Sequence, residues 1–97
     1  MSTPVATTRS AQIDIAVARA WYEAQQTGRG DVFLDELRDQ FDLISQNPAQ
    51  YGLVDRITRA ALMPHSKYVV YYRVEPNEVV VVAVQHASAD PRKWQRR

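Results

Sequence analysis

The stretch from Lys67 to His86 constrains the fold more than any other, because it predicts a β-hairpin. Tyr68 to Tyr72 and Val79 to Val84 are β-branched and aromatic runs of strand length, separated by the turn-forming residues Glu75 to Glu78. Neither run alternates between apolar and polar residues, so at least one strand should be covered on both faces. A two-stranded hairpin cannot bury that surface in water by itself. Another part of the chain must therefore lie across it.

The amino-terminal half supplies two predicted helices. The first should begin near Ser10, with Thr8 or Ser10 as its cap, and should end at Gly28-Arg29-Gly30. The second should run from Asp31 to the Asn47-Pro48 pair. Apolar residues recur at helical spacing at Ile13, Val17, Ala20, Trp21 and Ala24 in the first helix, and at Phe33 or Leu34, Leu37, Phe41 and Ile44 in the second. A connection this short makes an antiparallel helical hairpin, and we expect its apolar face to cover the sheet.

Three further segments complete the predicted fold. Met1 to Thr8 is either a frayed end or a short edge strand, and Ile57 to Met63 is a strand that Pro64 closes. Arg92 to Arg97 follow Asp90-Pro91 as a terminal helical turn. The sequence thus predicts the α+β class, with a single domain over residues 1–97. In it an antiparallel helical hairpin packs on a small, mainly antiparallel β-sheet of three to four strands.

Composition narrows the functional classes. With 97 residues and no cysteine, the chain can form one core and has neither disulfides nor a thiolate metal site. It contains no signal-peptide core and no apolar stretch of ~20 residues, so we expect a cytoplasmic protein without a membrane segment. Residues 1–54 carry four arginines against seven acids, a net charge of −3, whereas residues 55–97 carry eight basic residues against four acids, a net charge of +4. An acidic partner would therefore be attracted to the strand half.

Few residues could carry catalysis. The sequence motifs of phosphate-binding loops and metalloproteases are absent, and two histidines are too few for a metal site, so we expect no cofactor. His86, at a strand end beside a basic tail, could donate a proton in an RNA-cleaving site or simply hydrogen-bond to the backbone. The cations of the strand region could contact phosphate or an acidic peptide, or could form a solvated sheet edge. These cations are Arg56, Arg59, Lys67 and Arg73.

The aromatic residues point mainly to packing. Trp21, at helical spacing, is expected in the core. Tyr68, Tyr71 and Tyr72 are expected to pack on the sheet, with stacking on nucleic-acid bases as the alternative. Trp94 lies within a run of cations near the chain end, where it is either a structural staple or a contact surface.

A set of short motifs runs in order along most of the chain. It comprises Ala20-Trp-Tyr-Glu23, Gly30-x-x-Phe33-x-x-Glu36-Leu37, Ile44-x-x-Asn47-Pro48-x-x-Tyr51, Arg59-x-x-Leu62, Tyr68-x-Val70-x-Tyr72 and Val82-x-Val84-x-His86-x-x-x-Asp90-Pro91-x-x-Trp94. In this order the motifs resemble the ParE branch of the RelE/ParE toxin superfamily of bacterial type II toxin–antitoxin pairs. The fold of that family, a helical hairpin on a small antiparallel sheet, agrees with the fold predicted above.

The resemblance implies a small toxin held inactive by a ParD-like antitoxin in a hetero-oligomeric complex, without sequence-specific DNA binding by the toxin alone. Members of the ParE branch poison DNA gyrase, whereas members of the RelE branch cut messenger RNA on the ribosome. RelE-like chains usually place arginine where this chain has Ala87-Ser88-Ala89, and tyrosine where it has Trp94, so gyrase inhibition is favoured. The alternative is a ribosome-dependent, metal-independent endoribonuclease that uses His86, Arg73 and Arg59.

The chain also departs from the ParE-like pattern. Such chains usually carry Phe-Pro-Tyr near the start of the hairpin and arginine before the Asp-Pro pair, where this chain has Pro64-His65-Ser66 and Ala89. A non-catalytic module kept mainly for antitoxin binding is therefore a further alternative.

The outward surface of the hairpin is richer in Val and Tyr than a monomer of this size usually exposes, so we expect an acidic or amphipathic antitoxin segment to bind across the helical hairpin and the open part of the sheet. For the antitoxin, the expected contacts are Trp21, Phe41, Tyr68 and Tyr71, with Arg59 and Arg73 pairing acids. For the target, the expected contacts are Arg92, Lys93, Trp94, Arg96 and Arg97. We expect this tail to matter more for toxicity than for folding, so that Trp94→Ala costs no more than about 1 kcal/mol of stability.

Overall fold

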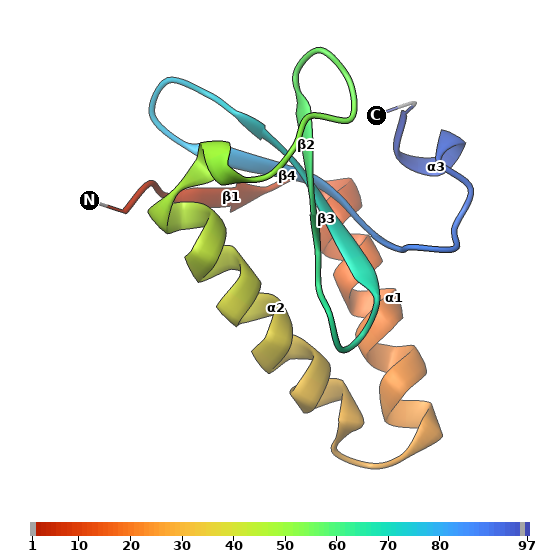
Figure 1. Cartoon of the computed structure of the whole chain (residues 1–97). Helices are drawn as coiled ribbons and strands as arrows, with labels where there is room; N and C mark the ends of the chain where they lie inside the picture. The colour runs from red at the N-terminus through yellow and green to blue at the C-terminus, as the bar shows by residue number, and fades with distance from the viewer. Residues whose placement is uncertain (1, 96) are drawn as a thin grey trace.

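The chain folds into two helices packed on a four-stranded sheet (Figure 1). The computed structural model describes residues 2–95 and 97. The elements are β1 (Val5–Thr7), α1 (Arg9–Gln25), α2 (Arg29–Gln46), the 3₁₀ helix η1 (Pro48–Gln50), β2 (Thr58–Leu62), β3 (Tyr68–Val74), β4 (Val79–His86) and α3 (Arg92–Gln95). The sheet has the order β1-β4-β3-β2, and β1 runs parallel to β4 while the other pairs are antiparallel. The predicted fold class is confirmed, and the first residues form an edge strand.

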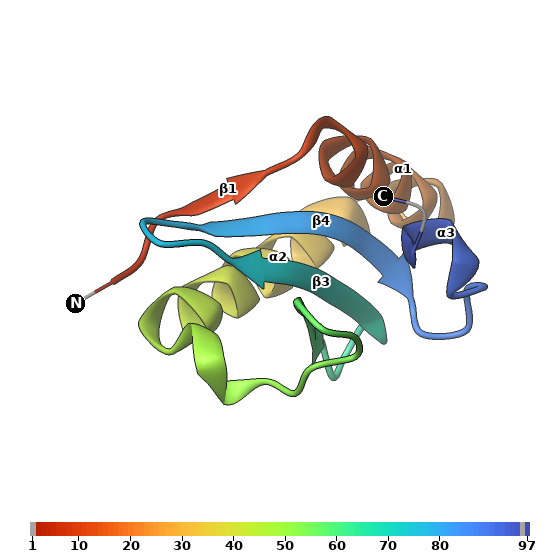
Figure 2. The same cartoon turned by 90° about the horizontal axis from the view of Figure 1, so that it is seen from above.

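The predicted hairpin of β3 and β4 is the centre of the sheet. Its register runs from Tyr68 opposite His86 to Val74 opposite Val79, and the Glu75 N–H closes the turn on the Glu78 carbonyl at 2.8 Å. Both strands extend two residues further than predicted, whereas β2 is shorter than the predicted strand. The register shifts once, between Tyr71 and Tyr72, which is the signature of a β-bulge. Figure 2 shows β1, β4 and β3 side by side, with α3 beyond the carboxyl end of β4.

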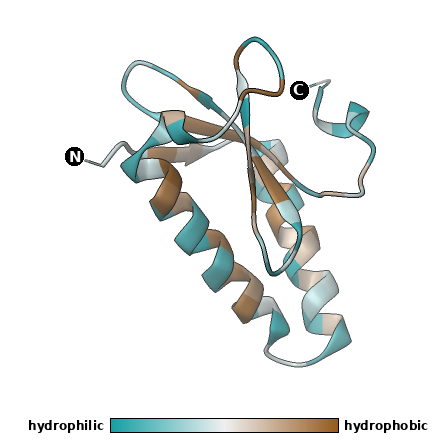
Figure 3. Ribbon diagram, in the orientation of Figure 1, coloured by the Kyte–Doolittle hydropathy of each residue, from teal (hydrophilic) through white to brown (hydrophobic). Residues whose placement is uncertain are grey.

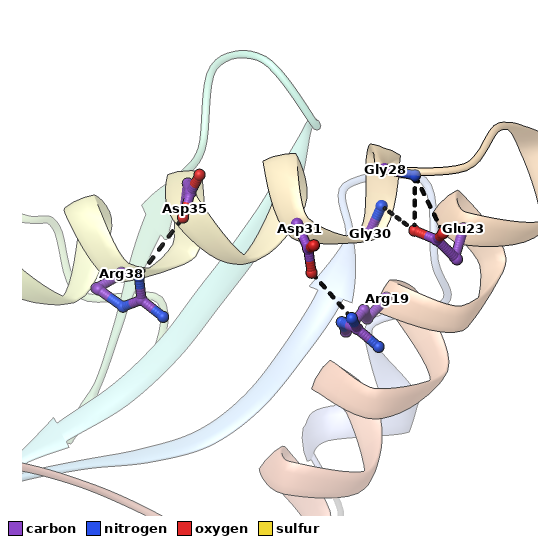
Figure 4. Close-up of polar contacts among 7 residues, drawn as sticks. All are labelled: Arg19, Glu23, Gly28, Gly30, Asp31, Asp35 and Arg38. Atoms are coloured by element: carbon purple, nitrogen blue, oxygen red, sulfur yellow. Dashed lines mark hydrogen bonds and ion pairs between the residues drawn. The ribbon is translucent and has the colours of Figure 1, made fainter.

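The connection between the helices is held by the carboxylate of Glu23 (Figure 4). This carboxylate accepts the backbone N–H groups of Gly28 and Gly30 at 3.0–3.1 Å, which satisfies donors at the start of α2. Gly28 has φ = 93°, a conformation that favours glycine, and a Cβ on Gly30 would lie 3.0 Å from the Arg19 carbonyl oxygen. Arg19 also pairs with Asp31 across the connection at 2.9 Å. The helices therefore meet closely here and diverge toward the sheet (Figure 1).

The main core lies between the helices and one face of the sheet, which we call the inner face. Figure 3 shows hydrophobic residues concentrated on β3 and β4, and alternating with hydrophilic residues along α2. The buried residues of this core are Ala11, Ala18, Phe33, Leu37, Ile44, Ala61, Met63, Val70, Tyr72, Val79, Val81 and Val84. The prediction for α2 is confirmed, because Phe33, Leu37 and Ile44 are buried.

The predicted core face of α1 is wrong. The helix buries Ala11 and Ala18, whereas Ile13, Val17 and Trp21 have exposed fractions of 54%, 64% and 56%. Small side chains let a helix approach a sheet closely, and α1 packs directly on β4. The larger apolar residues therefore form a stripe along the outside of α1.

The turn between β2 and β3 is clamped by both helices. The carboxylate of Glu36 on α2 accepts the backbone N–H groups of His65 and Ser66 at 2.8 and 3.0 Å. The hydroxyl of Tyr22 on α1 donates to the Ser66 carbonyl at 3.2 Å. Lys67, with φ = 63°, turns the chain into β3. These contacts hold the backbone of Pro64-His65-Ser66, the segment that replaces the Phe-Pro-Tyr of ParE-like chains.

The opposite face of the sheet, the outer face, is covered by the tail. Trp94 has an exposed fraction of 6% and packs on Val82 and Ala83 of β4. Its indole stacks on the ring of Tyr71 with 4.3 Å between centroids and 19° between planes. The guanidinium of Arg97 then pairs with Asp14 on α1, with Nη2 3.0 Å from Oδ1. Trp94 is therefore a structural residue that packs on the sheet, which is the first of the two alternatives that the sequence left open.

Candidate partner-binding site

A groove lies between α1 and the tail, and we call it the α1–tail groove. Val17 and Ala18 of α1 form one wall, and Tyr68, Val84, Gln85 and His86 from the ends of β3 and β4 form the floor. The second wall is the tail, with Ala89, Asp90, Arg92 and Lys93. Its volume is about 840 Å³, so it could hold a peptide segment.

The α1 wall is apolar and open to solvent. Ile13, Val17 and Trp21 follow each other at intervals of four residues, and they therefore lie on one face of the helix. Trp21 extends this wall over a smaller hollow that it shares with Tyr22, Tyr68 and His86. A contiguous apolar stripe next to a hollow is typical of a surface that binds a partner.

The tail wall is basic, but its charges are partly paired. Arg92 donates two hydrogen bonds to the Asp90 carboxylate, from Nε at 3.0 Å and from Nη2 at 2.7 Å. This hydrogen bonding holds the pKa of Asp90 below its ordinary value. Asp14, at the end of the groove, accepts the Val84 N–H at 3.0 Å as well as the Arg97 guanidinium. No carboxylate within residues 2–95 and 97 forms an ion pair with Lys93. The groove therefore offers cationic charge opposite an apolar wall.

His86 lies at the floor of the groove. Its Nδ1 accepts the backbone N–H of Ser88 at 3.1 Å and lies 2.7 Å from the Ser88 hydroxyl oxygen. A backbone N–H can only donate, so Nδ1 is the acceptor in this bond. The ring packs edge-on against Tyr68 at 5.3 Å, and burial raises the pKa of the Tyr68 hydroxyl. The histidine is thus positioned by its own strand end, in line with the backbone-bonding alternative.

The structure does not bring together the three residues considered for ribonuclease catalysis. His86 shares the inner face with its neighbour Tyr68, whereas Arg73 lies five residues further along β3 on the outer face. With a rise of about 3.3 Å per residue in a strand, Arg73 lies about 17 Å along β3 from Tyr68. Arg59, on β2, donates to the backbone carbonyls of Ala49 and Tyr51 at 3.3 and 2.6 Å. These three side chains cannot act on one bond in this arrangement.

The residues expected to contact an antitoxin fall on several surfaces. Trp21 and Tyr68 meet at the α1–tail groove. Phe41 packs partly against the core on the other helix, and Arg59 binds the η1 region. Tyr71 lies beneath Trp94 and Arg73 lies beside it, both on the outer face. No single surface therefore includes more than two of the six residues.

The tail residues expected to contact a target are also divided. Arg92 and Lys93 line the α1–tail groove, Trp94 is buried, and Arg97 is paired with Asp14. Arg96 lies outside the described residues. The burial of Trp94 argues against the expectation that it contributes little to folding, because the indole covers apolar residues of β4 that would otherwise contact water.

Sequence reasoning missed three acids that organise the site. Glu23, Glu36 and Asp14 each accept two or more hydrogen bonds: those of Glu23 close the connection between the helices, and those of Glu36 and Asp14 join segments far apart in the chain. The signal in the sequence is weak, because each acid looks like an ordinary residue of a solvated helix face. Asp14 stands between Ala11 and Ala18 on the side of α1 that proved to be buried, and this spacing was the available clue.

Among the described residues, no helix is long and apolar enough to cross a membrane. The same residues contain no cluster of histidine and acidic side chains that could hold a metal ion.

The fold of the chain is similar to that of a solved structure. It superimposes with a TM-score of 0.77 on a chain of the solved structure described as "Chromosomal ParDE TA system from P. aeruginosa", at 13% sequence identity, over 88% of this chain and 96% of that one. A search of curated proteins finds no match. The family model described as "ParE toxin of type II toxin-antitoxin system, parDE" matches residues 5–91. The chain therefore belongs to the ParE toxin family of type II toxin–antitoxin systems.

Proposed function

We propose that this protein inhibits DNA gyrase and is neutralised by a ParD-like antitoxin that binds in the α1–tail groove. The observation that carries the second part is the exposed stripe of Ile13, Val17 and Trp21 beside a hollow with a basic wall. An amphipathic segment with acidic residues on one side complements both walls. This segment would cover apolar side chains that a monomer leaves in contact with water.

Gyrase inhibition rests on membership of the ParE family and on the dispersion of the candidate catalytic groups. A binding mode of action needs surface and charge but no general acid or base. A ribosome-dependent nuclease would need cations and a proton donor near one phosphate. His86, Arg73 and Arg59 lie at separate places on the sheet, so they supply no such centre.

The first test addresses the antitoxin. The toxin is co-expressed with the product of the neighbouring reading frame, and the complex is isolated through a tag on the antitoxin. Val17→Asp should reduce recovery of the complex at least tenfold, because it puts an uncompensated charge into the buried contact. Leu43→Asp is the matched control, since Leu43 is exposed on α2 and does not line the groove. Equal recovery of both variants would contradict the assignment of the groove.

The second test addresses the target. The purified toxin is added to a gyrase supercoiling assay and, separately, to a translating extract with a defined messenger RNA. Loss of supercoiling with intact messenger RNA supports gyrase inhibition. Cleavage of the messenger RNA with normal supercoiling would establish the nuclease instead, and no effect in either assay would favour a binding module.

A further inference from the structure

Exposed apolar side chains gather at two separate places on this chain. Ten large apolar residues of the described chain are exposed, and six of them form two clusters. One cluster is the stripe of α1 beside the α1–tail groove. The other is Leu53, Val54 and Ile57, with exposed fractions of 53%, 48% and 61%, in the segment 52–57 before β2, which we call the β2 loop. Single exposed apolar residues are ordinary, but clusters of this kind indicate contact surfaces.

The β2 loop presents its apolar side chains on a fixed backbone. The Val54 N–H donates to the Thr58 carbonyl at 2.8 Å. The Asp55 carboxylate accepts the N–H groups of Ile57 and Thr58 at 2.9 and 2.6 Å. Figure 1 shows this loop at the end of the sheet, away from the connection between the helices. A loop that is ordered before it binds loses little conformational entropy in the contact.

The loop and the α1–tail groove complement each other in shape and in apolar character. The loop projects from the sheet, whereas the groove is a hollow of about 840 Å³ with the apolar side chains of α1 along one wall. Bringing the two surfaces together removes both clusters from water, which is favourable. Each cluster therefore offers the cover that the other lacks.

The charges of the two surfaces are also complementary. The groove is lined by three bases against two acids, a net charge of +1, and these are Arg92, Lys93, Arg97, Asp14 and Asp90. The β2 loop and the β3–β4 turn lie at one end of the sheet, because Thr58 pairs with Arg73. This end carries three acids against one base, a net charge of −2, and these are Asp55, Glu75, Glu78 and Arg56. Attraction favours a loop against a groove, and repulsion disfavours two loops or two grooves.

The loop of one copy cannot enter its own groove. The loop borders the tail on the outer face, where Ile57 and Arg97 line one hollow. The groove lies on the other side of the tail, and Arg97 lines its end as well. The tail thus separates the two surfaces within a single copy. The contact must join two molecules.

We propose that a second copy of this chain occupies the α1–tail groove, with its β2 loop packed on Ile13, Val17 and Trp21. Each copy then contributes one loop and one groove to the assembly. The contact rests on the geometry of the two surfaces and not on the identity of the antitoxin or of the target. If the antitoxin also binds in the groove, as proposed above, the second copy and the antitoxin compete for it.

Mixing two variants tests this contact. Val17→Asp puts a charge into the groove and Ile57→Asp puts one on the loop, and both side chains are exposed. The full-length chain, made by cell-free synthesis, is followed by sedimentation over about 1–100 μM. The wild-type chain should associate, and each variant alone should associate at least about tenfold more weakly. An equal mixture should form a one-to-one pair, because Val17→Asp retains an intact loop and Ile57→Asp retains an intact groove.

Leu43→Asp is the matched control, since Leu43 is exposed on α2 and belongs to neither surface. It should associate like the wild-type chain, and circular dichroism verifies that each variant is folded. The proposal is overturned by a wild-type chain that stays monomeric, by a mixture that associates no better than its components, or by an equal loss in Leu43→Asp.

The indole N–H of Trp21 gives a local reading of the same contact. Trp21 is 56% exposed on α1, away from the loop of its own copy, so a response of its signal to residue 57 must come from a neighbouring molecule. In ¹⁵N spectra this signal should shift as the concentration rises in the wild-type chain and stay in place in Ile57→Asp. Association without a shift of Trp21 would refute the assignment of the groove. Recovery of the antitoxin complex should be unchanged in Ile57→Asp, which separates this contact from the proposed antitoxin site.

Discussion

Replacing Trp94 with alanine should destabilise the domain, because the indole is the main cover of the outer face. An aromatic side chain of this kind buries 150–250 Å², which at about 25 cal/mol per Å² corresponds to roughly 4–6 kcal/mol as an upper limit. Trp94 is 94% removed from solvent, given its exposed fraction of 6%, so nearly all of that area counts. Its unsatisfied indole N–H offsets about 1–3 kcal/mol. The expected loss is therefore about 1–5 kcal/mol.

Urea denaturation followed by circular dichroism measures this loss. In a domain of this size, each 1 kcal/mol lowers the melting temperature by about 4–8 °C, so thermal unfolding gives a second reading. Trp94→Phe is the matched variant: it keeps the stacking on Tyr71 and removes the unsatisfied donor, so it should lose markedly less. A loss under about 1 kcal/mol for Trp94→Ala would show that the tail is not packed on the sheet and would refute the reasoning.

Two further predictions concern buried polar groups. Tyr72→Phe removes the hydroxyl that donates to the Pro48 carbonyl at 2.6 Å and should cost about 1 kcal/mol at neutral pH. Because burial raises the pKa of Tyr72 in the folded state, stability should fall as the pH rises above the ordinary tyrosine value, and denaturation curves should show a shallower alkaline fall for the variant. Glu36→Gln leaves one of the two turn N–H groups without its acceptor and should lower stability by about 1–3 kcal/mol in a urea titration. An unchanged midpoint would show that the turn is not held by this carboxylate.

The sequence predicted the elements well where local signals are strong. The β-branched runs around the Glu75 to Glu78 turn, the Thr8 cap and the Asn47 end of α2 all appear as expected. Each of these depends on residues close together in the chain. Local chemistry therefore decides them before any tertiary contact forms.

The orientation of α1 could not be predicted in the same way. Its two sides carry comparable apolar content, with Ile13, Val17 and Trp21 on one and Ile15 and Tyr22 on the other. The choice depends on how closely the helix approaches β4 and on the Val84 N–H that Asp14 accepts. The helix–strand distance and this hydrogen bond both depend on tertiary structure, which the local sequence does not encode. The same limit applies to the groove, whose walls are formed by segments about 70 residues apart in the chain.

Strand β4 pairs with β1 near the start of the chain and is covered by Trp94 near its end, and both contacts bear on the order of folding during synthesis. Val5 to Thr7 pair with Val79 to Val81, so the first strand has no partner until almost the whole chain has been made. The segment around Trp94, which covers the outer face of β4, follows β4 in the chain. Contacts of such long range are slow to form and leave a nascent chain open while it is on the ribosome. The sheet can therefore be completed only after β4 has been synthesised.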